Sequence, residues 1–340
     1  DSRQSAAKLS AGIELDHFRD VLRWAILHAL DGSSEVVSFL KKMFDATNWT
    51  KLDGQRISII ASDRTYGEVA RVIMANHMGF ATEEQLAMLN TYFKCSDGQN
   101  LGSIEDDVFK TLLSLGMNPA GPKPTCFYDI NGGIWYNLFD FEKETTKPDL
   151  SQNQLNFYDN IRKNNKIEQL TSIFSNRKRS FEELKLGYLT PTREIGDSTM
   201  KELACSAIRI LGEKKRIKEI TSKYPQTDSF PMAVRKLIQH VYHINSRKET
   251  NERLETLRDL LRDYGIIDRQ YTVLTGEGLS FVKADVGSTY WVCPRCKTIH
   301  MHPANGICLN CCHKLDKEYV LTEEDVTHPN DYYLSLLNST

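Results

Sequence analysis

Apolar residues recur at every third or fourth position along most of the chain, which is the spacing of amphipathic α-helices. Thr82, with Gln85 three positions later, has the form of a capping box and marks the start of one helix. The segment RISIIASD at 56–63 fits a short buried strand or the entry of a helix. In the first half of the chain the pattern predicts helices over residues 1–30, 33–49, 65–79, 82–95 and 104–115.

The pattern changes after residue 198. Three amphipathic segments follow one another: TMKELACSAIRILG (199–212), SFPMAVRKLIQHVYHI (229–244) and ETNERLETLRDLLRDYGII (249–267). The next segment, QYTVLTGEGLSFVKAD, alternates in the manner of a strand around Gly276 and Gly278, which favours a hairpin. Three helices followed by a hairpin is the order of a winged-helix module. Such a module binds nucleic acid or serves as a docking platform for proteins, and the pattern leaves both readings open.

Two segments between these helical regions have different compositions. Aromatic residues crowd 125–141, where they fit packing in a core or subdomain better than stacking on unpaired bases, and 143–154 is polar and reads as a linker. We therefore predict a mainly α (α+β) fold with a helical insertion, a winged-helix-like module and a small zinc ribbon. The expected units are 1–30, a motif helix; 31–150, the helical insertion; 151–198, a linker and helical region; 199–287, the winged-helix-like module; 288–318, the zinc ribbon; and 319–340, a return to a motor core.

Composition adds limits to this picture. With 340 residues, 40% of them hydrophobic, the chain is long enough for two or three compact units. No apolar run reaches the length of a membrane-spanning helix, and the opening residues do not have the form of a signal peptide. Several of the eight cysteines have no partner at a disulfide-like spacing, so we expect a cytoplasmic protein without membrane contact.

A net charge of −2 hides a basic middle third. Between Ile161 and Ile266, 22 Lys and Arg stand against 14 Asp and Glu. A basic region of this kind either binds nucleic acid or is simply a solvated face. The candidate phosphate contacts are Lys214, Lys215, Arg216, Lys218, Arg247 and Lys248.

Two C-x-x-C pairs lie close together near the end of the chain, Cys293 with Cys296 and Cys308 with Cys311. Two thiolates two residues apart close a tight knuckle on one side of a metal, and a second knuckle completes the tetrahedral shell that Zn²⁺ prefers. Four thiolates leave no open position for water, so the site would be structural and not catalytic. The alternatives are two disulfides or exchange of a ligand; the substitute ligands are Cys312, His300, His302 and His313.

The opening residues, DSRQSAAKLSAGIELDHFRD, resemble the motif IV region in the second RecA-like domain of large bacterial superfamily 2 helicases. These are the multi-domain DEAD/DEAH-box enzymes found in anti-phage defence and DNA repair. The segments LLSLGMNPAGP (112–122), FEELKLGYL (181–189) and WVCPRCKTIHMHPANGIC (291–308) look similar as well, and NDYYLSLL (330–337) resembles the point where such inserts rejoin the motor. The chain also opens without Met on a capped helix, so we expect a segment of a larger protein.

The resemblance implies an ATP-driven motor with this chain as its accessory or insertion region, binding and guiding DNA. It places Ser2 and Arg3 near the bound strand, and it implies the rest of the motor and defence or repair proteins as partners. ATP and Mg²⁺ would belong to the parent only, because the sequence has no G-x-x-x-x-G-K-[ST] phosphate loop and no arginine-finger element. The acids at 105–107 lie on a predicted helix and do not replace a DEAH box. The alternative function is a partner-recruiting module that does not bind nucleic acid.

Overall fold

The computed structural model describes residues 14–94, 98–175, 179–218, 220 and 228–327. Helices form about 53% of the structure and the strands are short, which confirms the mainly α fold with small sheets. The expected helical turns at 1–13, with Ser2 and Arg3, lie outside the described residues. The same is true of 328–340 at the other end.

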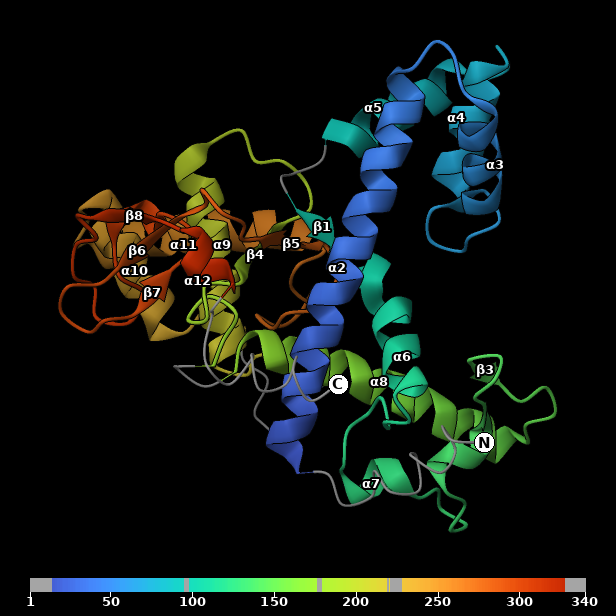
Figure 1. Cartoon of the computed structure of the whole chain (residues 1–340). Coiled ribbons are helices and arrows are strands. Elements are labelled where there is room, and N and C mark those ends of the chain that lie inside the picture. The colour runs from blue at the N-terminus through green and yellow to red at the C-terminus, as the bar shows by residue number, and fades with distance from the viewer. Residues whose placement is uncertain (1–13, 95–97, 176–178, 219, 221–227, 328–340) are drawn as a thin grey trace.

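One long helix, α2 (Leu15–Asp45), crosses the molecule and packs against α4, α6 and α8 (Figure 1). The sequence predicted two helices here with a break near Gly32, and that prediction is wrong. A glycine inside a helix costs only about 1 kcal/mol relative to alanine. Leu30 and Ser33, on either side of Gly32, are both buried by neighbouring elements. Tertiary packing on both sides of the glycine therefore keeps the helix continuous.

The second half of α2 carries a helical arm. It consists of α3 (Lys51–Ile60), α4 (Gly67–His77) and α5 (Glu83–Lys94), which lie together at one end of the molecule in Figure 1. The arm has its own apolar core, which is separate from the main one. Its most deeply buried members include Leu40, Met43, Ile57, Ile73 and Leu89.

Two local predictions can be checked in this arm. Residues 56–60 form the last part of helix α3, so RISIIASD is neither a strand nor the entry of a helix but the end of one. The capping box is confirmed. The Thr82 N–H donates to Gln85 Oε1 at 2.9 Å, and the Gln85 N–H donates to Thr82 Oγ1 at 3.2 Å.

The aromatic segment forms a second apolar core, below the arm. Trp135 is fully buried and packs with Phe139 and Phe141, which confirms a packing role for these rings. Helix α8 begins at Gln152, inside the segment 143–154 expected as a linker, and Ser151 caps it. The elements here are η2 (Leu101–Ile104), α6 (Glu105–Ser114), α7 (Pro124–Phe127), η3 (Trp135–Leu138), β2 (Phe139–Asp140), β3 (Thr145–Thr146) and α8 (Gln152–Ile173).

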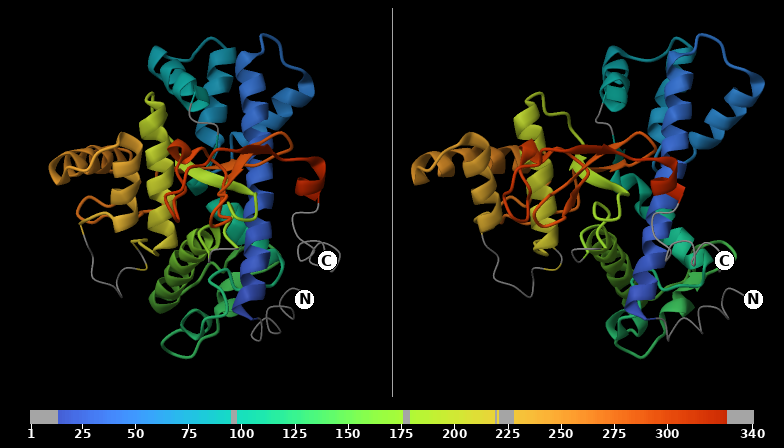
Figure 2. Two further views of the ribbon diagram at one scale, coloured as in Figure 1. Left: turned by 90° about the vertical axis from the view of Figure 1, so that its left-hand side faces the viewer. Right: turned by 60° about the vertical axis from the view of Figure 1, so that its left-hand side comes forward.

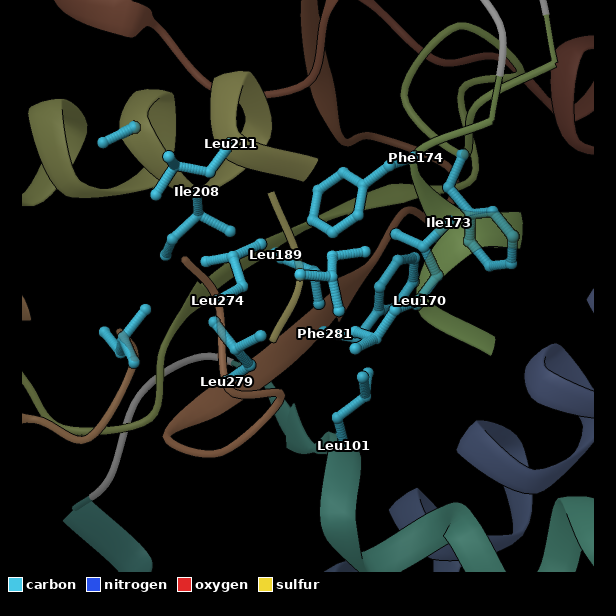
Figure 3. Close-up of a cluster of buried hydrophobic side chains, with 14 of the residues drawn as sticks. Leu101, Leu170, Ile173, Phe174, Leu189, Ile208, Leu211, Leu274, Leu279 and Phe281 are labelled. Carbon is cyan, nitrogen blue, oxygen red and sulfur yellow. The ribbon is translucent and has the colours of Figure 1, made fainter. Parts of the chain in front are cut away.

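A three-stranded antiparallel sheet lies at the centre of the molecule. Its order is β1 (Gln99–Asn100), β5 (Leu279–Lys283), β4 (Gly187–Pro191). Helix α9 (Ser198–Glu213) packs on β4. Figure 3 shows the core between them, in which Phe281 is completely buried and lies edge-on to Phe181 with ring centres 5.3 Å apart. The sheet therefore joins segments that lie far apart in the sequence.

Helices α10 (Met232–Tyr242) and α11 (Arg247–Asp263) follow α9 as predicted. The hairpin expected after them is wrong, because β5 pairs with β1 and β4 and not with the residues before Gly276. Both Gly276 and Gly278 have positive φ angles, of 77° and 63°. The carbonyl of Gly278 accepts the N–H of Thr192, so the chain turns towards β4.

The last described part of the chain is a small β unit beside α9 (Figure 2). Its sheet has the order β7 (Ile299–His300), β6 (Thr289–Val292), β8 (Glu318–Val320). It also contains η5 (Ala304–Gly306) and is followed by α12 (Glu323–Thr327). We call residues 288–320 the ribbon. Among the described helices none combines the length and the apolarity needed to cross a bilayer.

Gly212 offers a direct test of how α9 packs. A Cβ atom at this position would lie 2.2 Å from the Phe174 ring, whereas a Cβ at the helical Gly54 would meet nothing within 4 Å. Alanine favours a helix at both positions, but only the first creates a clash. We expect Gly212→Ala to lower the free energy of unfolding by about 1–3 kcal/mol and Gly54→Ala to raise it by about 0.5–1 kcal/mol. Urea unfolding curves of both variants provide the measurement, and a Gly212→Ala protein as stable as Gly54→Ala would contradict this packing.

Candidate metal centre and the groove beside it

The first knuckle begins where β6 ends, at Cys293. The N–H of Lys297 donates to the Cys293 carbonyl at 3.0 Å, and the Cys293 N–H donates to the Thr298 carbonyl at 2.9 Å. Lys297 has a φ of 60°, so the chain reverses directly after Cys296. These bonds point the side chains of Cys293 and Cys296 to the same side of the turn.

The second knuckle repeats the first bond for bond. The N–H of Cys312 donates to the Cys308 carbonyl at 2.9 Å, and the Cys308 N–H donates to the His313 carbonyl at 2.8 Å. Cys312 has a φ of 56° and takes the place that Lys297 has in the first knuckle. Its position after the turn excludes it from the cluster that Cys311 joins.

The four predicted cysteines meet between the knuckles. The Sγ atoms of Cys293 and Cys311 are 3.5 Å apart, as are those of Cys296 and Cys308, and all four lie within 4.8 Å of one another. A disulfide needs about 2.0 Å between its sulfur atoms, so the two-disulfide alternative is wrong. Sulfur ligands at about 2.3 Å around a tetrahedral ion lie about 3.8 Å apart. The cluster therefore has the size and the donor set to hold a metal ion.

The four thiols differ in burial and in hydrogen bonding, and therefore in pKa. Cys293 and Cys308 are completely buried, and burial raises the pKa of Cys308. Burial also opposes ionisation of Cys296, but hydrogen bonds from the hydroxyl and backbone of Thr298 outweigh it and lower the pKa of Cys296 to about 6. The Thr298 Oγ1 atom lies 3.2 Å from Cys296 Sγ. One thiolate thus forms readily at neutral pH, and the other thiols lose their protons when a cation binds.

The three histidines considered as substitute ligands lie outside this cluster. His300 is buried with its Nδ1 atom 3.5 Å from Arg209 Nη1, and His302 is buried with its ring beside that of Tyr188. His313 is exposed and contributes its backbone carbonyl to the second knuckle. These alternatives are therefore wrong, since the ribbon directs their side chains elsewhere.

A buried arginine fastens the ribbon to α9. Arg209 donates to Glu182 Oε2 at 2.7 Å, to the Ile299 carbonyl at 2.8 Å and to Glu213 Oε1 at 2.8 Å. Glu182 also accepts the N–H of Met301 at 3.2 Å. One guanidinium thereby ties the segment after α8, helix α9 and strand β7 together.

The pKa values of the groups in this network are shifted in different ways. Burial opposes the charge of Arg209, but the carboxylates of Glu182 and Glu213 raise its pKa above the ordinary value. Burial also raises the pKa of the neighbouring Glu183, to about 7, although Arg209 lies nearby. Burial raises the pKa of Glu182 as well, whereas the nearby Arg209 guanidinium and the N–H of Met301 favour its carboxylate form.

A groove of about 800 Å³ opens where the second knuckle meets the ends of α8 and α9, and we call it the basic groove. Leu309 and Asn310, the two residues inside the second C-x-x-C, form part of its wall. Lys214 and Lys215 stand exposed at the end of α9 and line it as well. Five cationic residues line the groove against two acidic ones: Arg19, Arg23, Arg179, Lys214 and Lys215 against Asp16 and Glu213.

The other predicted phosphate contacts have different positions. Arg216 donates to the Ser229 carbonyl, and Lys218 pairs with Asp268 at 2.8 Å, so both hold local structure. Arg247 and Lys248 are exposed in the first turn of α11. Helix α10 lines the groove only at its start, through Ala233, and α11 begins after its other end. Only two of the six predicted side chains therefore line the concave surface beside the metal knuckle.

The sequence did not single out the arginines of the basic groove. Arg19 and Arg23 come from α2, and Arg179 comes from the turn after α8. Each of the three already pairs with a carboxylate, whereas the side chains of Lys214 and Lys215 are exposed. No local spacing connects these segments, so only the folded chain reveals the groove.

A second concavity, of about 640 Å³, lies between the arm and the central sheet. Three cationic residues line it against two acidic ones: Lys41, Arg64 and Arg162 against Glu105 and Asp106. Arg162 pairs with Glu105 and Asp106, and Arg64 lies 3.7 Å from Asp106. The acids at 105–107 stand on helix α6, as predicted. The excess of cationic over acidic lining residues is therefore smaller here than in the basic groove.

Comparisons of this chain with protein-family models, with curated proteins and with solved structures give no match.

Two adjacent cysteines provide a matched test of the metal centre. We expect Cys311→Ser to remove a ligand and to reduce bound metal far below one ion per chain, while Cys312→Ser retains about one. Elemental analysis of the purified proteins and thermal unfolding with and without a chelator are the measurements. Equal metal content in the two variants would contradict the ligand set.

We expect the buried His302 to make the stability of the folded protein depend on pH. Burial, with a further contribution from Arg209, lowers the pKa of His302 to about 3, whereas an unfolded histidine titrates near its ordinary 6.5. The folded state thus binds fewer protons, so its stability is full above pH 6.5 and falls as the pH drops through this range. The slope approaches about 1.4 kcal/mol per pH unit.

His302→Phe keeps an aromatic ring beside Tyr188 and removes the titrating group. The difference in unfolding free energy between the wild type and this variant isolates His302, because metal loss and the titration of Glu182 and Glu183 are common to both proteins. We expect the difference to shift in favour of the variant as the pH falls below 6.5. A difference that stays constant from neutral pH down to about pH 4 would contradict the assignment.

Proposed function

We propose that this chain is an accessory region that contains a structural zinc ion and binds the phosphate backbone of nucleic acid. The observation that carries the proposal is the basic groove, which two exposed lysines line together with residues of the second knuckle. Phosphate contacts by lysine and arginine supply most of the affinity for nucleic acid without regard to base sequence. A concave surface with an excess of cations concentrates the field and favours such a polyanion.

Zinc is the metal that suits the centre best. Four thiolates in a tetrahedral arrangement are its preferred structural shell, and the closed shell leaves no position for a reacting water. The knuckle that carries Leu309 and Asn310 would keep its shape through the bound ion. The ion therefore contributes structure to the groove and no catalysis.

The helices beside the groove support a winged-helix-like reading. After α9, Ile217 forms a parallel bridge with Leu274, and Leu274 also forms an antiparallel bridge with Ile267, which follows α11. A helix, a bridge residue, two helices and two further bridge residues occupy the places that helices and strands have in that module. Helix α11 is an unsuitable recognition helix, however, since the acids Glu249, Glu252 and Asp259 are exposed on it. The groove beside α9 is the better candidate for contact with phosphates.

The wider role follows from the resemblance of the opening segment to superfamily 2 helicases. In this proposal a DEAD/DEAH-box motor supplies ATP hydrolysis, and the present chain grips or guides DNA in an anti-phage defence or repair enzyme of the cytoplasm. This chain has no phosphate loop of its own. Its contribution would therefore be binding and not hydrolysis.

A second candidate, recruitment of a partner protein, draws support from the arm. Large apolar side chains are exposed on α3 and after α4, where surfaces are normally polar. Leu52 and Ile59 are each 75% exposed, and Phe80 is 78% exposed. This function would not depend on Lys214 or Lys215.

Salt-dependent binding separates the two candidates. We expect fluorescence anisotropy with single-stranded oligo(dT) and with a duplex to show log–log salt slopes that grow with the number of phosphates contacted. The double substitution Lys214→Ala/Lys215→Ala should reduce the slope for a single strand by about 1.4. No binding by the wild type at low salt would overturn nucleic-acid binding by this chain.

The matched control is Lys143→Ala/Lys147→Ala. It removes the same charge from the exposed β2–β3 region, which Figure 1 places on the opposite side of the molecule from the ribbon. A non-specific effect of net charge would change both double variants equally. We expect the control to bind with the wild-type slope.

A further inference from the structure

The first metal knuckle carries two cations that have no evident structural task. Arg295 lies between Cys293 and Cys296, Lys297 follows them, and both side chains are exposed. The reversed backbone of Lys297 places this residue on the outer turn of the knuckle. In addition, the segment from Cys293 to Leu315 contains no Asp or Glu. The ribbon itself therefore contributes no carboxylate along this edge.

A short chain of contacts connects this edge to the basic groove. Asn310 lines the groove, and its Nδ2 atom lies 3.4 Å from the Thr298 hydroxyl oxygen. Thr298 directly follows Lys297 and touches Cys296 in the metal cluster. The path from the lysines at the end of α9 thus crosses the second knuckle and reaches Lys297 without meeting a carboxylate of the ribbon.

The walls of the groove carry apolar side chains below its charged rim. Ile217, Ala233 and Leu309 contribute to the lining. A volume of about 800 Å³ is that of a pocket for a small organic molecule, so unstacked bases fit into it whereas a stacked duplex does not. Apolar surface for bases and cations for the backbone is the combination by which proteins bind single strands.

We infer that a single strand of nucleic acid lies across the metal centre, with bases in the basic groove and phosphates that continue over the second knuckle to Arg295 and Lys297. This inference rests on the proposed function and extends it to a strand type and a path. The metal knuckles then form part of the binding surface and do more than hold the fold.

A competing explanation assigns these cations to the metal itself. Four thiolates around Zn²⁺ carry a net charge of −2, and nearby cations stabilise such a centre. The two explanations differ in what the double variant Arg295→Ala/Lys297→Ala changes. Under the inference it weakens nucleic-acid binding and leaves metal retention unchanged, whereas under the alternative it accelerates metal release from the free protein.

The test compares this double variant with Lys143→Ala/Lys147→Ala in the full chain. The probes are oligo(dT) about 15 nucleotides long and a duplex of the same length, followed by anisotropy across a salt series. We expect the single strand to bind the wild type more tightly than the duplex does. Loss of two phosphate contacts should lower the single-strand slope by about 1.4 and the affinity at about 0.1 M salt by roughly 10-fold or more.

Metal release to a chromogenic chelator provides a second readout. Saturating oligo(dT) should slow the release from the wild type and the control, because the strand covers Cys296 and Cys311, and should protect the double variant much less. Faster release from the free double variant would overturn the inference in favour of the metal-centred explanation. Wild-type slopes in this variant would also overturn it.

The groove itself is tested separately by Lys214→Ala/Lys215→Ala. If that variant binds weakly while Arg295→Ala/Lys297→Ala matches the control, the proposed function stands and the path over the knuckles is wrong. If the wild type binds neither probe at low salt, both fail together. Tighter binding of the duplex than of the single strand would overturn the assigned strand type.

Discussion

A buried guanidinium needs hydrogen-bond acceptors from the protein, because water cannot reach it. The acceptors around Arg209 come from separate parts of the chain. Glu182 follows α8, Glu213 lies on α9 and the Ile299 carbonyl belongs to the ribbon. Removal of one member of a buried ion pair costs about 3–5 kcal/mol, so loss of Glu182, the carboxylate closest to Arg209, would be strongly destabilising. These segments therefore reach their final positions together, and the ribbon has one favourable place on α9. The groove between them exists only because this assembly is complete.

The ribbon depends on two fixed points because its own core is small. Its apolar clusters contain only a few buried side chains, among them Tyr290, Met301, Ala304 and Leu315. A unit of this size usually needs a metal or a cross-link to fold. The cysteine cluster closes one end of the ribbon, and the Arg209 network holds the other against α9. Leu309 and Asn310 lie on the metal side, where the basic groove begins.

Sequence patterns predicted the parts of this structure that local spacing determines. Helical periodicity located α4, α5, α6 and α9 to α11, and two C-x-x-C pairs identified the four cysteines that cluster and could hold a metal ion. Tertiary contacts decided the rest. Packing on both sides of Gly32 made α2 continuous, and β4 captured the strand expected in a hairpin. The arginines of the groove could not be predicted together, since they meet only after folding.

The continuity of α2 has a mechanical consequence. At 31 residues the helix is about 46 Å long. Arg19 near its start lines the basic groove, and Lys41 near its end lines the concavity beneath the arm. A straight rod of this length that tilts by about 5° about one end moves its other end by about 4 Å. The two concave surfaces therefore share one unbroken element, and no hinge within α2 separates them.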